Sequence, residues 1–322
     1  MKIGVVISGG DVTGINNFIF QVARLAQADI VLFNGGIPGL LANQHHSIAR
    51  RDLVDFSISS MPIISSGRTA KKLVASEYEA IGKQLKALHI DVLIMAGGDG
   101  SLQFLNTLSE FGVNCFGVGM TIDNDVFGSY YTIGFSTACE QVIKEVSKLR
   151  NTGRALPGRV FMIELLGGYC GELTLQSAIK SNADFALIPE CQHPLNALAE
   201  KITHRLERQN SVIILCSEGY TKEYSPGFQG AIDTMIKQLE PKIGVRIRKT
   251  IVGYGLRNGD PTCEEIYQGT LMASEVVRCI HSGMKNKAII INAGNQPIPI
   301  DLISMQNVWS TPKDTITNSP GS

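Results

Sequence analysis

The chain has 322 residues, of which 44% are hydrophobic and 18% charged, and its formal net charge is zero. This composition predicts a folded protein of one or two domains and excludes a disordered chain. The charge balance excludes the basic character of a typical nucleic-acid-binding protein, although a few well-placed arginines would still bind an anionic substrate. The seven cysteines follow no metal-binding spacing, so neither a zinc site nor a disulfide framework is expected.

The first residues, from Met1 to Asp11, contain only a short apolar run, which predicts that they are not a signal peptide. No apolar stretch approaches the roughly 20 residues that a membrane helix needs. Free thiols are typical of a reducing compartment. We therefore expect a cytoplasmic protein with no membrane or nucleic-acid partner.

Strand-like apolar runs recur along the chain, and each is followed by a turn that contains glycine or serine. The runs are Ile3–Ile7, Ile30–Phe33, Val92–Met95, Cys115–Val118, Val160–Leu165 and Val212–Cys216. Helical patterns follow at about Ile15–Ala26, Leu102–Phe111 and Leu173–Ser181. Because the runs are continuously apolar and alternate with helices, they predict an α/β fold with parallel sheets covered on both faces. Ligands in such folds bind at the carboxyl ends of the strands, where the glycine turns lie.

Two other segments bear on the organisation of the chain. Thr152–Gly158 contains two glycines and a proline, which makes it a candidate junction between two sheet domains. The tail from about Ser310 is rich in Thr, Ser, Pro and Asn and is expected to fray.

Two of the glycine turns are suited to phosphate. Gly9-Gly10-Asp11 lies between a strand and a helix, where backbone N–H groups can point at an anion, but the same pattern also serves as a tight turn without a ligand. In Gly97-Gly98-Asp99-Gly100-Ser101 the glycines allow close approach of a phosphate, and Asp99 offers a carboxylate for Mg²⁺. Several kinase classes share this second pattern, so it predicts nucleotide phosphates more firmly than it predicts one reaction.

Thr121-Ile122-Asp123-Asn124-Asp125 places two carboxylates just past a strand. Phosphoryl transfer to a hydroxyl needs a base at the attacking oxygen, and Asp123 can accept that proton while Asp125 orients the acceptor. The alternative is a turn whose Asx side chains bond their own backbone. Arginines are then needed to hold a phosphate-bearing acceptor. The candidates are Arg68, Arg159, Arg248 and Arg257.

The order and spacing of these motifs, from Lys2 to about Leu302, resemble the bacterial ATP-dependent 6-phosphofructokinase family. Further segments that carry the resemblance are Tyr131–Phe135, Tyr169–Leu175, Pro189-Glu190, Ser217-Glu218 and Gly253 to Arg257. The resemblance implies two Rossmann-like three-layer α/β/α domains with mostly parallel sheets. Residues 1–135 plus about 256–303 would bind the nucleotide, and about 136–255 plus about 304–322 would bind the sugar phosphate.

The resemblance also implies roles at matching positions. Asp123 would be the general base, with Thr121 and Asp125 beside it, and Arg68 would bridge donor and acceptor. Thr121 and Gly10 complete the implied catalytic set. ATP would be held by Gly10, Arg68, Thr69, Gly98, Asp99, Gly100 and Ser101, with Asp99 on Mg²⁺. The sugar phosphate would be held by Thr121, Asp123, Asp125, Arg159, Leu166, Gly167, Glu218, Arg248, Tyr254 and Arg257. Arg159 and Arg248 would reach in from a neighbouring subunit, which implies a homotetramer or a homodimer.

Several positions depart from the family pattern. Tyr254 replaces a histidine at the acceptor phosphate, Gly168 replaces an arginine, and Leu166 replaces a methionine. Around the nucleotide base the changed positions are Gly36, Thr69 and Phe104. Gly100 and Met120 favour a nucleotide donor, because pyrophosphate-dependent relatives carry aspartate and lysine there. The resemblance also implies a pocket of basic residues that binds effectors. Basic residues of this pocket are replaced at Phe20 and Gln209-Asn210-Ser211, although Arg24, Arg150 and Glu190 remain.

The leading interpretation is a glycolytic kinase that converts ATP and D-fructose 6-phosphate to ADP and D-fructose 1,6-bisphosphate. One alternative is a related kinase that uses another sugar phosphate, such as sedoheptulose 7-phosphate, or another donor. A second is a non-catalytic phosphofructokinase-like subunit, which the presence of Arg68, Asp99 and Asp123 disfavours. An NAD or lipid kinase would not explain Thr121–Asp125 or Glu218.

Overall fold

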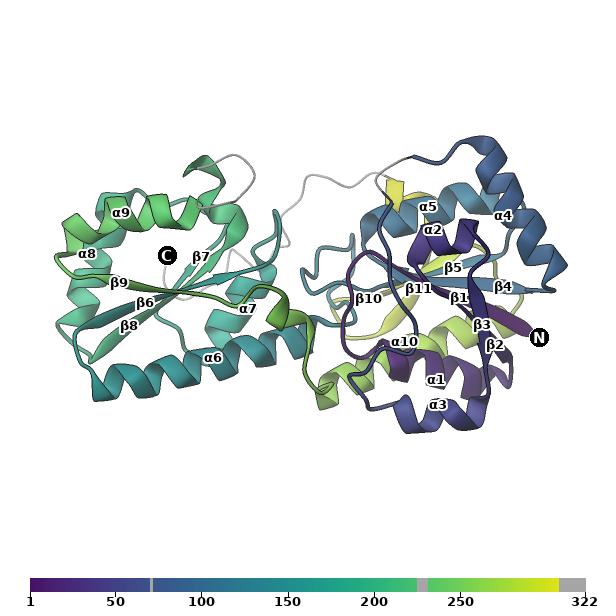
Figure 1. The fold of residues 1–322 in the computed structure, drawn as a ribbon, viewed down its shortest axis with the longest axis horizontal. Coiled ribbons are helices and arrows are strands. Elements are labelled where there is room, and N and C mark those ends of the chain that lie inside the picture. Colours follow the sequence, from purple (N-terminus) through teal and green to yellow (C-terminus); the bar gives the residue numbers. More distant parts are fainter. Residues whose placement is uncertain (70–71, 225–230, 307–322) are drawn as a thin grey trace.

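Two sheets of buried strands organise the chain, and each forms the middle layer of one of two lobes (Figure 1). The structure, a computed structural model, describes residues 1–69, 72–224 and 231–306. The expected frayed tail from Ser310 lies outside these residues. Within them, no helix is long and apolar enough to cross a membrane.

The first lobe contains a seven-stranded sheet in the order β11-β10-β5-β4-β1-β2-β3. Its strands are β1 (Lys2–Ser8), β2 (Asp29–Phe33), β3 (His45–Ile48), β4 (Val92–Gly97), β5 (Cys115–Gly119), β10 (Lys287–Ile291) and β11 (Pro297–Asp301). The five inner strands run parallel, and the two edge strands β3 and β11 pair antiparallel. The continuously apolar runs therefore form the parallel sheet that the sequence predicts.

Helices cover both faces of this sheet (Figure 1). One face carries α1 (Ile15–Ala26), α3 (Arg50–Phe56) and α10 (Cys263–His281), and the other carries α2 (Gly36–Leu41), α4 (Ala75–Ala87) and α5 (Asp99–Glu110), with η3 (Leu302–Gln306) against α5. Neighbouring residues of β1 enter opposite cores, because Val5 belongs to the core that contains Phe18 of α1 whereas Val6 belongs to the core that contains Leu105 of α5.

The second lobe contains a four-stranded, wholly parallel sheet in the order β7-β8-β6-β9. Its strands are β6 (Arg159–Leu165), β7 (Phe185–Leu187), β8 (Ser211–Ser217) and β9 (Ile247–Ile251), and its helices are α7 (Glu172–Ser181), α8 (Leu195–Leu206), α9 (Ala231–Ile243) and η1 (Glu218–Tyr224). Together the two lobes confirm the expected α/β class with two layered units and mostly parallel sheets.

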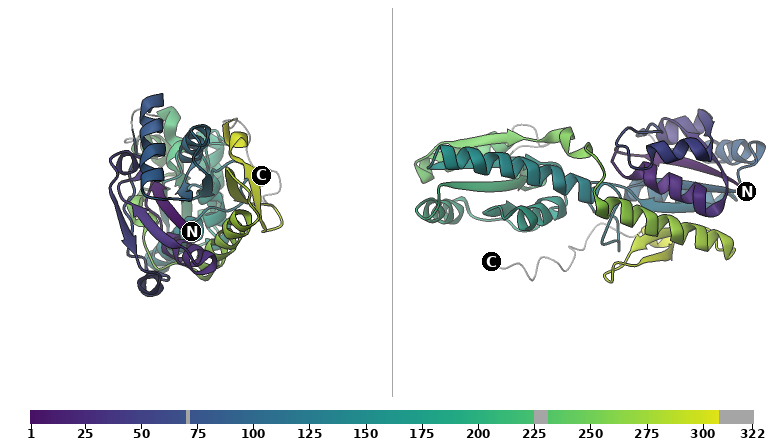
Figure 2. Two further views of the ribbon diagram at one scale, coloured as in Figure 1. Left: turned by 90° about the vertical axis from the view of Figure 1, so that its right-hand side faces the viewer. Right: turned by 90° about the horizontal axis from the view of Figure 1, so that it is seen from below.

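The 21-residue helix α6 (Phe135–Ala155) and the short helix η2 (Gly253–Arg257) connect the lobes. The expectation that Thr152–Gly158 joins two sheet domains is wrong, because α6 runs through the first part of this segment and begins between the lobes. Gly153 is buried in α6, where a β-carbon would collide with the Ser211 side chain. This glycine allows close packing of helix on sheet and does not mark a linker. Seen from below, α6 and α10 extend in opposite directions from neighbouring starting points (Figure 2).

Candidate active site

A cavity of about 780 Å³ lies between the lobes, at the carboxyl ends of β1, β4, β5 and β6. It brings together most of the residues that the motifs single out. Its walls include Gly10, Arg68, Thr69, Gly98, Asp99, Gly100, Ser101, Thr121, Asp123, Asp125, Gly167 and Arg257. These residues come from distant parts of the chain, and the parallel topology gathers them at one edge.

The start of α5 forms an open cradle in the first-lobe wall. A β-carbon at Gly98 or Gly100 would meet no atom within 4 Å, so backbone is exposed to the cavity at both positions. Gly97 is different, because a β-carbon there would lie 2.6 Å from the Ser8 carbonyl oxygen. The Ser101 hydroxyl donates to that same oxygen at 3.2 Å and so ties α5 to β1. This open N-terminus of a 12-residue helix suits a phosphate group.

Asp99 is the acidic side chain in the first turn of α5, and its Oδ1 accepts a hydrogen bond from the Phe127 N–H at 3.4 Å. Among the residues that the structure describes, no group of three or more His, Cys, Asp or Glu side chains is arranged to hold a metal. Mg²⁺ is commonly held by one or two carboxylates together with substrate phosphates and water. The residues present therefore fit a Mg²⁺ that would arrive with a nucleotide, and Asp99 is the carboxylate that would hold it.

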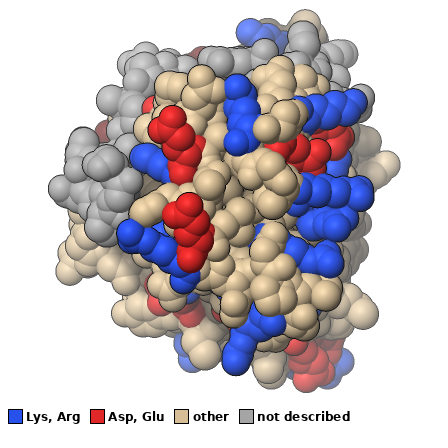
Figure 3. Space-filling model, turned by 90° about the vertical axis from the view of Figure 1, so that its left-hand side faces the viewer, with Lys and Arg blue, Asp and Glu red and all other residues tan. Residues whose placement is uncertain are grey.

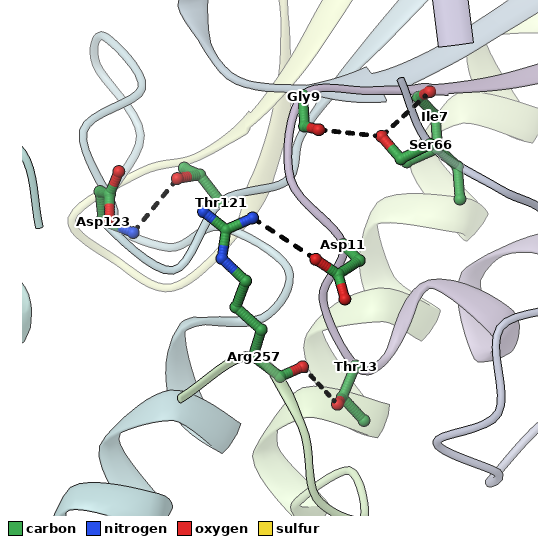
Figure 4. A network of polar contacts seen from close by, with 8 residues as sticks. All are labelled: Ile7, Gly9, Asp11, Thr13, Ser66, Thr121, Asp123 and Arg257. Carbon is green, nitrogen blue, oxygen red and sulfur yellow. Dashed lines mark hydrogen bonds and ion pairs between the residues drawn. The ribbon is translucent and has the colours of Figure 1, made fainter. Parts of the chain in front are cut away.

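The loop after β5 is held by its own side chains. Asn124 is buried in the left-handed conformation, with φ 53°, and its Nδ2 donates to the Tyr130 carbonyl oxygen at 3.2 Å. The Asp123 N–H donates to the Thr121 hydroxyl at 3.2 Å, and the Thr132 hydroxyl donates to the Thr121 carbonyl oxygen at 2.7 Å. Asparagine tolerates the left-handed conformation better than most residues. The loop thus presents the Asp123 carboxylate to the cavity (Figure 4).

Burial, reinforced by the neighbouring Asp125 and Glu218 carboxylates, raises the pKa of Asp123 to about 6, against the opposing effects of Arg257 and Arg68. A general base is most effective when its pKa lies near the working pH. Asp123 is therefore largely ionised at neutral pH and still basic enough to accept a proton.

Arg257, at the end of η2, lies between the Gly10 turn and the Asp123 loop (Figure 4). A β-carbon at Gly10 would collide with its guanidinium, and its Nη1 lies 3.4 Å from Asp11 Oδ1. The Thr13 hydroxyl contacts the Arg257 carbonyl oxygen at 3.4 Å. A glycine at position 10 is required for this approach, which places one guanidinium beside both candidate substrate positions.

The second-lobe wall is built on the turn after β6. Glu218 Oε1 accepts from the N–H groups of Gly167 and Gly168 at 3.3 and 2.9 Å. Glu218 is expected from the sequence to contact sugar, but it holds this turn and does not itself line the cavity. Leu166 also lies off the cavity and packs against the core. A β-carbon at Gly168 would meet nothing within 4 Å, so the position at which the resemblance implies an arginine is open.

Three other expected acceptor ligands do not line the cavity. Arg159 begins β6, whose other end leads to Gly167, so at about 3.3 Å per residue it lies roughly 20 Å from the cavity edge. Arg248 lies beside Phe161, near the same end of the sheet. Figure 3 shows this end of the lobe, over which lysine and arginine side chains are spread. Tyr254 is 75% exposed, and its ring centroid lies 5.4 Å from the Arg257 guanidinium carbon.

Sequence reasoning missed part of the second-lobe wall. Tyr169, Cys170, Glu172, Leu175 and Ile188 line the cavity, as does Glu190, which the resemblance placed in an effector pocket. Glu190 Oε1 accepts from the Gly171 N–H at 2.7 Å. The glycine turn at Gly167 was the sequence signal for this wall. The contact between this turn and the loop after β7 depends on tertiary packing, which the local sequence does not show.

The expected effector residues are dispersed. Phe20 and Arg24 line a separate cavity of about 510 Å³ with Arg50 and Arg51, two arginines that the sequence did not single out. Arg150 lies in the other lobe, where it pairs with Asp184 at 3.1 Å. Gln209 also bonds Asp184, at 2.8 Å.

Two of the positions that the resemblance places around the nucleotide base, Phe104 and Gly36, are closely packed. Phe104 is 7% exposed, its ring centroid lies 5.4 Å from that of Tyr78 in a tilted arrangement, and neither ring lines the cavity. Gly36 has φ 64°, and a β-carbon there would collide with the Gly67 backbone. No side chain can replace hydrogen at Gly36 without moving this backbone.

Known proteins match this chain over most of its length. Residues 2–280 match the family model described as Phosphofructokinase. An ATP-dependent 6-phosphofructokinase of Teredinibacter turnerae is 31% identical over 97% of this chain and 95% of its own length. A probable ATP-dependent 6-phosphofructokinase of Mycoplasma pneumoniae is 31% identical over 93% of this chain and 90% of its own length.

Solved structures share the fold. A pyrophosphate-dependent phosphofructokinase of Nitrosospira multiformis has a TM-score of 0.84 at 17% identity, and the alignment covers 97% of this chain and 86% of that one. The phosphofructokinase of Pichia pastoris has a TM-score of 0.83 at 23% identity over 94% of this chain, which spans only 37% of that longer chain. Because the family model spans residues 2–280 and both bacterial relatives match more than nine-tenths of this chain, the chain belongs to the phosphofructokinase family.

Proposed function

We propose that the protein is an ATP-dependent 6-phosphofructokinase that converts ATP and D-fructose 6-phosphate to ADP and D-fructose 1,6-bisphosphate in glycolysis. One observation carries the proposal: a single cavity holds the open phosphate cradle at Gly98 and Gly100 together with Asp123, a carboxylate whose pKa is raised to about 6. The two relatives named as ATP-dependent 6-phosphofructokinases match this chain over more than nine-tenths of its length.

In the proposed reaction, Asp123 accepts the proton of the attacking sugar hydroxyl. The hydroxyl oxygen bonds to the terminal phosphorus of ATP while the bond from that phosphorus to the bridging oxygen breaks, and ADP leaves. Arg68 and Arg257, both on the cavity wall, balance the charge on the transferred group. When bound, Mg²⁺ would neutralise donor phosphate charge beside Asp99.

The charges on the wall support a need for further cations. The acidic side chains among the described lining residues are Asp99, Asp123, Asp125, Glu172 and Glu190, and the basic ones are Arg68 and Arg257. Two phosphate-bearing substrates are themselves negatively charged, so this excess of acidic side chains would repel them. Mg²⁺ and the Arg159 and Arg248 side chains of a neighbouring copy would supply the missing positive charge, which favours a homo-oligomer, with a tetramer as the expected form and a dimer as the alternative. We place the enzyme in the cytoplasm, with no nucleic-acid or membrane partner.

A second acceptor is also consistent with the cavity, because the wall is open at Gly168 and lacks the arginine that the resemblance implies there. Such space suits a longer sugar phosphate such as sedoheptulose 7-phosphate.

A coupled assay that crosses ATP, GTP and pyrophosphate with a panel of sugar phosphates tests these proposals. We expect the highest kcat/KM for ATP with fructose 6-phosphate. A higher value with sedoheptulose 7-phosphate would favour the second acceptor, and a higher value with pyrophosphate would overturn the donor assignment. Absence of turnover with every pair, in protein shown to be folded, would favour a non-catalytic subunit.

A further inference from the structure

Glu265 on α10 is a fully buried carboxylate behind the cavity, and it is not one of the lining residues. A buried carboxylate is costly unless its oxygens accept hydrogen bonds. Its partners therefore indicate what holds it in place.

The first set of partners is the start of α6. Glu265 Oε1 accepts from the Gly134 N–H at 2.7 Å, and Oε2 accepts from the Thr137 N–H at 3.2 Å and the Thr137 hydroxyl at 3.1 Å. Gly134 is the N-cap of α6 and has no side chain with which to cap the helix. The first N–H groups of a helix have no partners within it, and a negative charge is favoured there. Glu265 thus caps α6 from another helix, at the point where α6 leaves for the second lobe.

The second contact is with the loop of residues 9–14 between β1 and α1, which contains the Gly9-Gly10-Asp11 turn and is called the donor loop below. Gly14 is the N-cap of α1, just after the Gly9-Gly10-Asp11 turn, and a β-carbon there would lie 2.5 Å from Glu265 Cγ. A β-carbon at Gly134 would lie 2.5 Å from Val12 Cβ, and Val12 lines the cavity. The two cap glycines adopt the same conformation, with φ 99° and 104° and ψ −21° at both. Both glycines therefore lack side chains where the donor loop, Glu265 and the start of α6 meet.

A chain of hydrogen bonds also leads from Glu265 to Asp123. Gly134 follows Ile133, whose N–H donates to the Gly119 carbonyl oxygen at 2.9 Å and whose carbonyl oxygen accepts from the Thr121 N–H at 3.0 Å. Thr121 in turn accepts from the Asp123 N–H at 3.2 Å. The segment that Glu265 anchors is the one on which the Asp123 loop rests.

We propose that Glu265 is a positioning residue that fixes the donor loop and the Asp123 loop relative to each other. The proposal rests on the proposed phosphoryl transfer, whose rate depends mainly on the placement of donor, acceptor and base. Loss of one carboxylate oxygen would leave a buried N–H at the start of α6 without an acceptor, and both loops would lose a common support.

Glu265→Gln tests the proposal because it keeps the size of the side chain but replaces one acceptor oxygen with an N–H₂ group. Glu264→Gln is the matched control, since Glu264 is the adjacent residue, is exposed, and accepts a hydrogen bond from the Gln268 side chain on the same helix at 2.6 Å. We expect Glu265→Gln to lower kcat about tenfold or more while both KM values change less than about threefold. The control should retain kcat within about twofold.

Hydrogen–deuterium exchange supplies a readout that needs no turnover. In Glu265→Gln, amides of residues 9–15 and 119–125 should exchange faster than in the wild type, and in the control they should not. Faster exchange confined to α10 and α6, or kcat within twofold of the wild type, would show a merely structural cap and overturn the proposal. If the wild type turns over no substrate pair, the proposed function fails, but the exchange result still decides the positioning role.

Thr137→Val covers the case in which Glu265→Gln does not fold. This change removes only the hydroxyl that donates to Oε2 and leaves a side chain of similar shape. We expect faster exchange in the same two loops, to a smaller extent. Unchanged exchange in both loops would overturn the proposal.

Discussion

The two walls of the cavity are built differently. The first-lobe wall follows long, buried parallel strands, and bonds such as Ser101 to Ser8 and Asn124 to Tyr130 hold its turns. The second-lobe wall carries Tyr169, which is 53% exposed, and its turn depends on the Glu218 and Glu190 carboxylates. From this difference we predict that substitutions in the first-lobe wall affect turnover most, whereas substitutions in the second-lobe wall affect the choice of acceptor.

The largest expected effect comes from the first-lobe wall. Asp123→Ala should lower kcat by about 10²–10⁴-fold with a smaller change in the KM for sugar phosphate, because a base acts mainly in the transition state. Steady-state kinetics of the purified variant measure both constants. If the variant retained more than about a tenth of the wild-type kcat, Asp123 would not be the base.

The next largest effect on activity is expected from Arg248, at the end of the second lobe that lies away from the cavity. If Arg248 serves the cavity of another copy, Arg248→Ala and Asp123→Ala should each be nearly inactive alone. Mixing them under subunit exchange should then restore activity, since some cavities in the hybrid contain both intact residues. No recovery, with exchange verified by native mass spectrometry, would mean that each chain supplies its whole site.

A smaller effect is expected at the phosphate cradle. Gly100→Asp should raise the KM for ATP about tenfold, because it places a carboxylate beside the donor phosphates. Space at position 100 accommodates the side chain without collision, so folding should be unaffected. Gly100→Asn is the control of equal size without charge. An equal KM in both variants and the wild type would show that donor phosphates do not approach Gly100.

The smallest effect concerns regulation. With Phe20 and Gln209 in place of basic residues, ADP should activate weakly and phosphoenolpyruvate should inhibit weakly, because charge-assisted bonds of about 1.5–3 kcal/mol each are missing. Saturation curves for sugar phosphate with and without about millimolar effector, at fixed magnesium, measure this response. A clear leftward shift with ADP would contradict the prediction and would direct attention to Arg50 and Arg51, which line the cavity with Arg24.

The strands and site residues of the first lobe were more predictable from the sequence than those of the second lobe. Buried parallel strands such as β1 and β4 are continuously apolar, and their glycine turns adjoin them directly, so both strand and site were predictable. The edge strand β3 and the short strands β7 and β9 are only partly buried, and their pattern is weak. Glu218 accepts a hydrogen bond from a residue 50 positions earlier in the chain, and Glu265 accepts one from a residue 131 positions earlier. Local sequence patterns do not reveal such distant partners.

The pH dependence of kcat/KM tests the role of Asp123 most directly. The carboxylate is the active form, so activity should be constant above its pKa and fall as the pH decreases through about 6. Over the range in which circular dichroism shows both proteins folded, the residual activity of Asp123→Ala should lack this acid limb. An acid limb of the same midpoint in the variant, or none in the wild type between about pH 5 and 7, would contradict the account of Asp123 as the base.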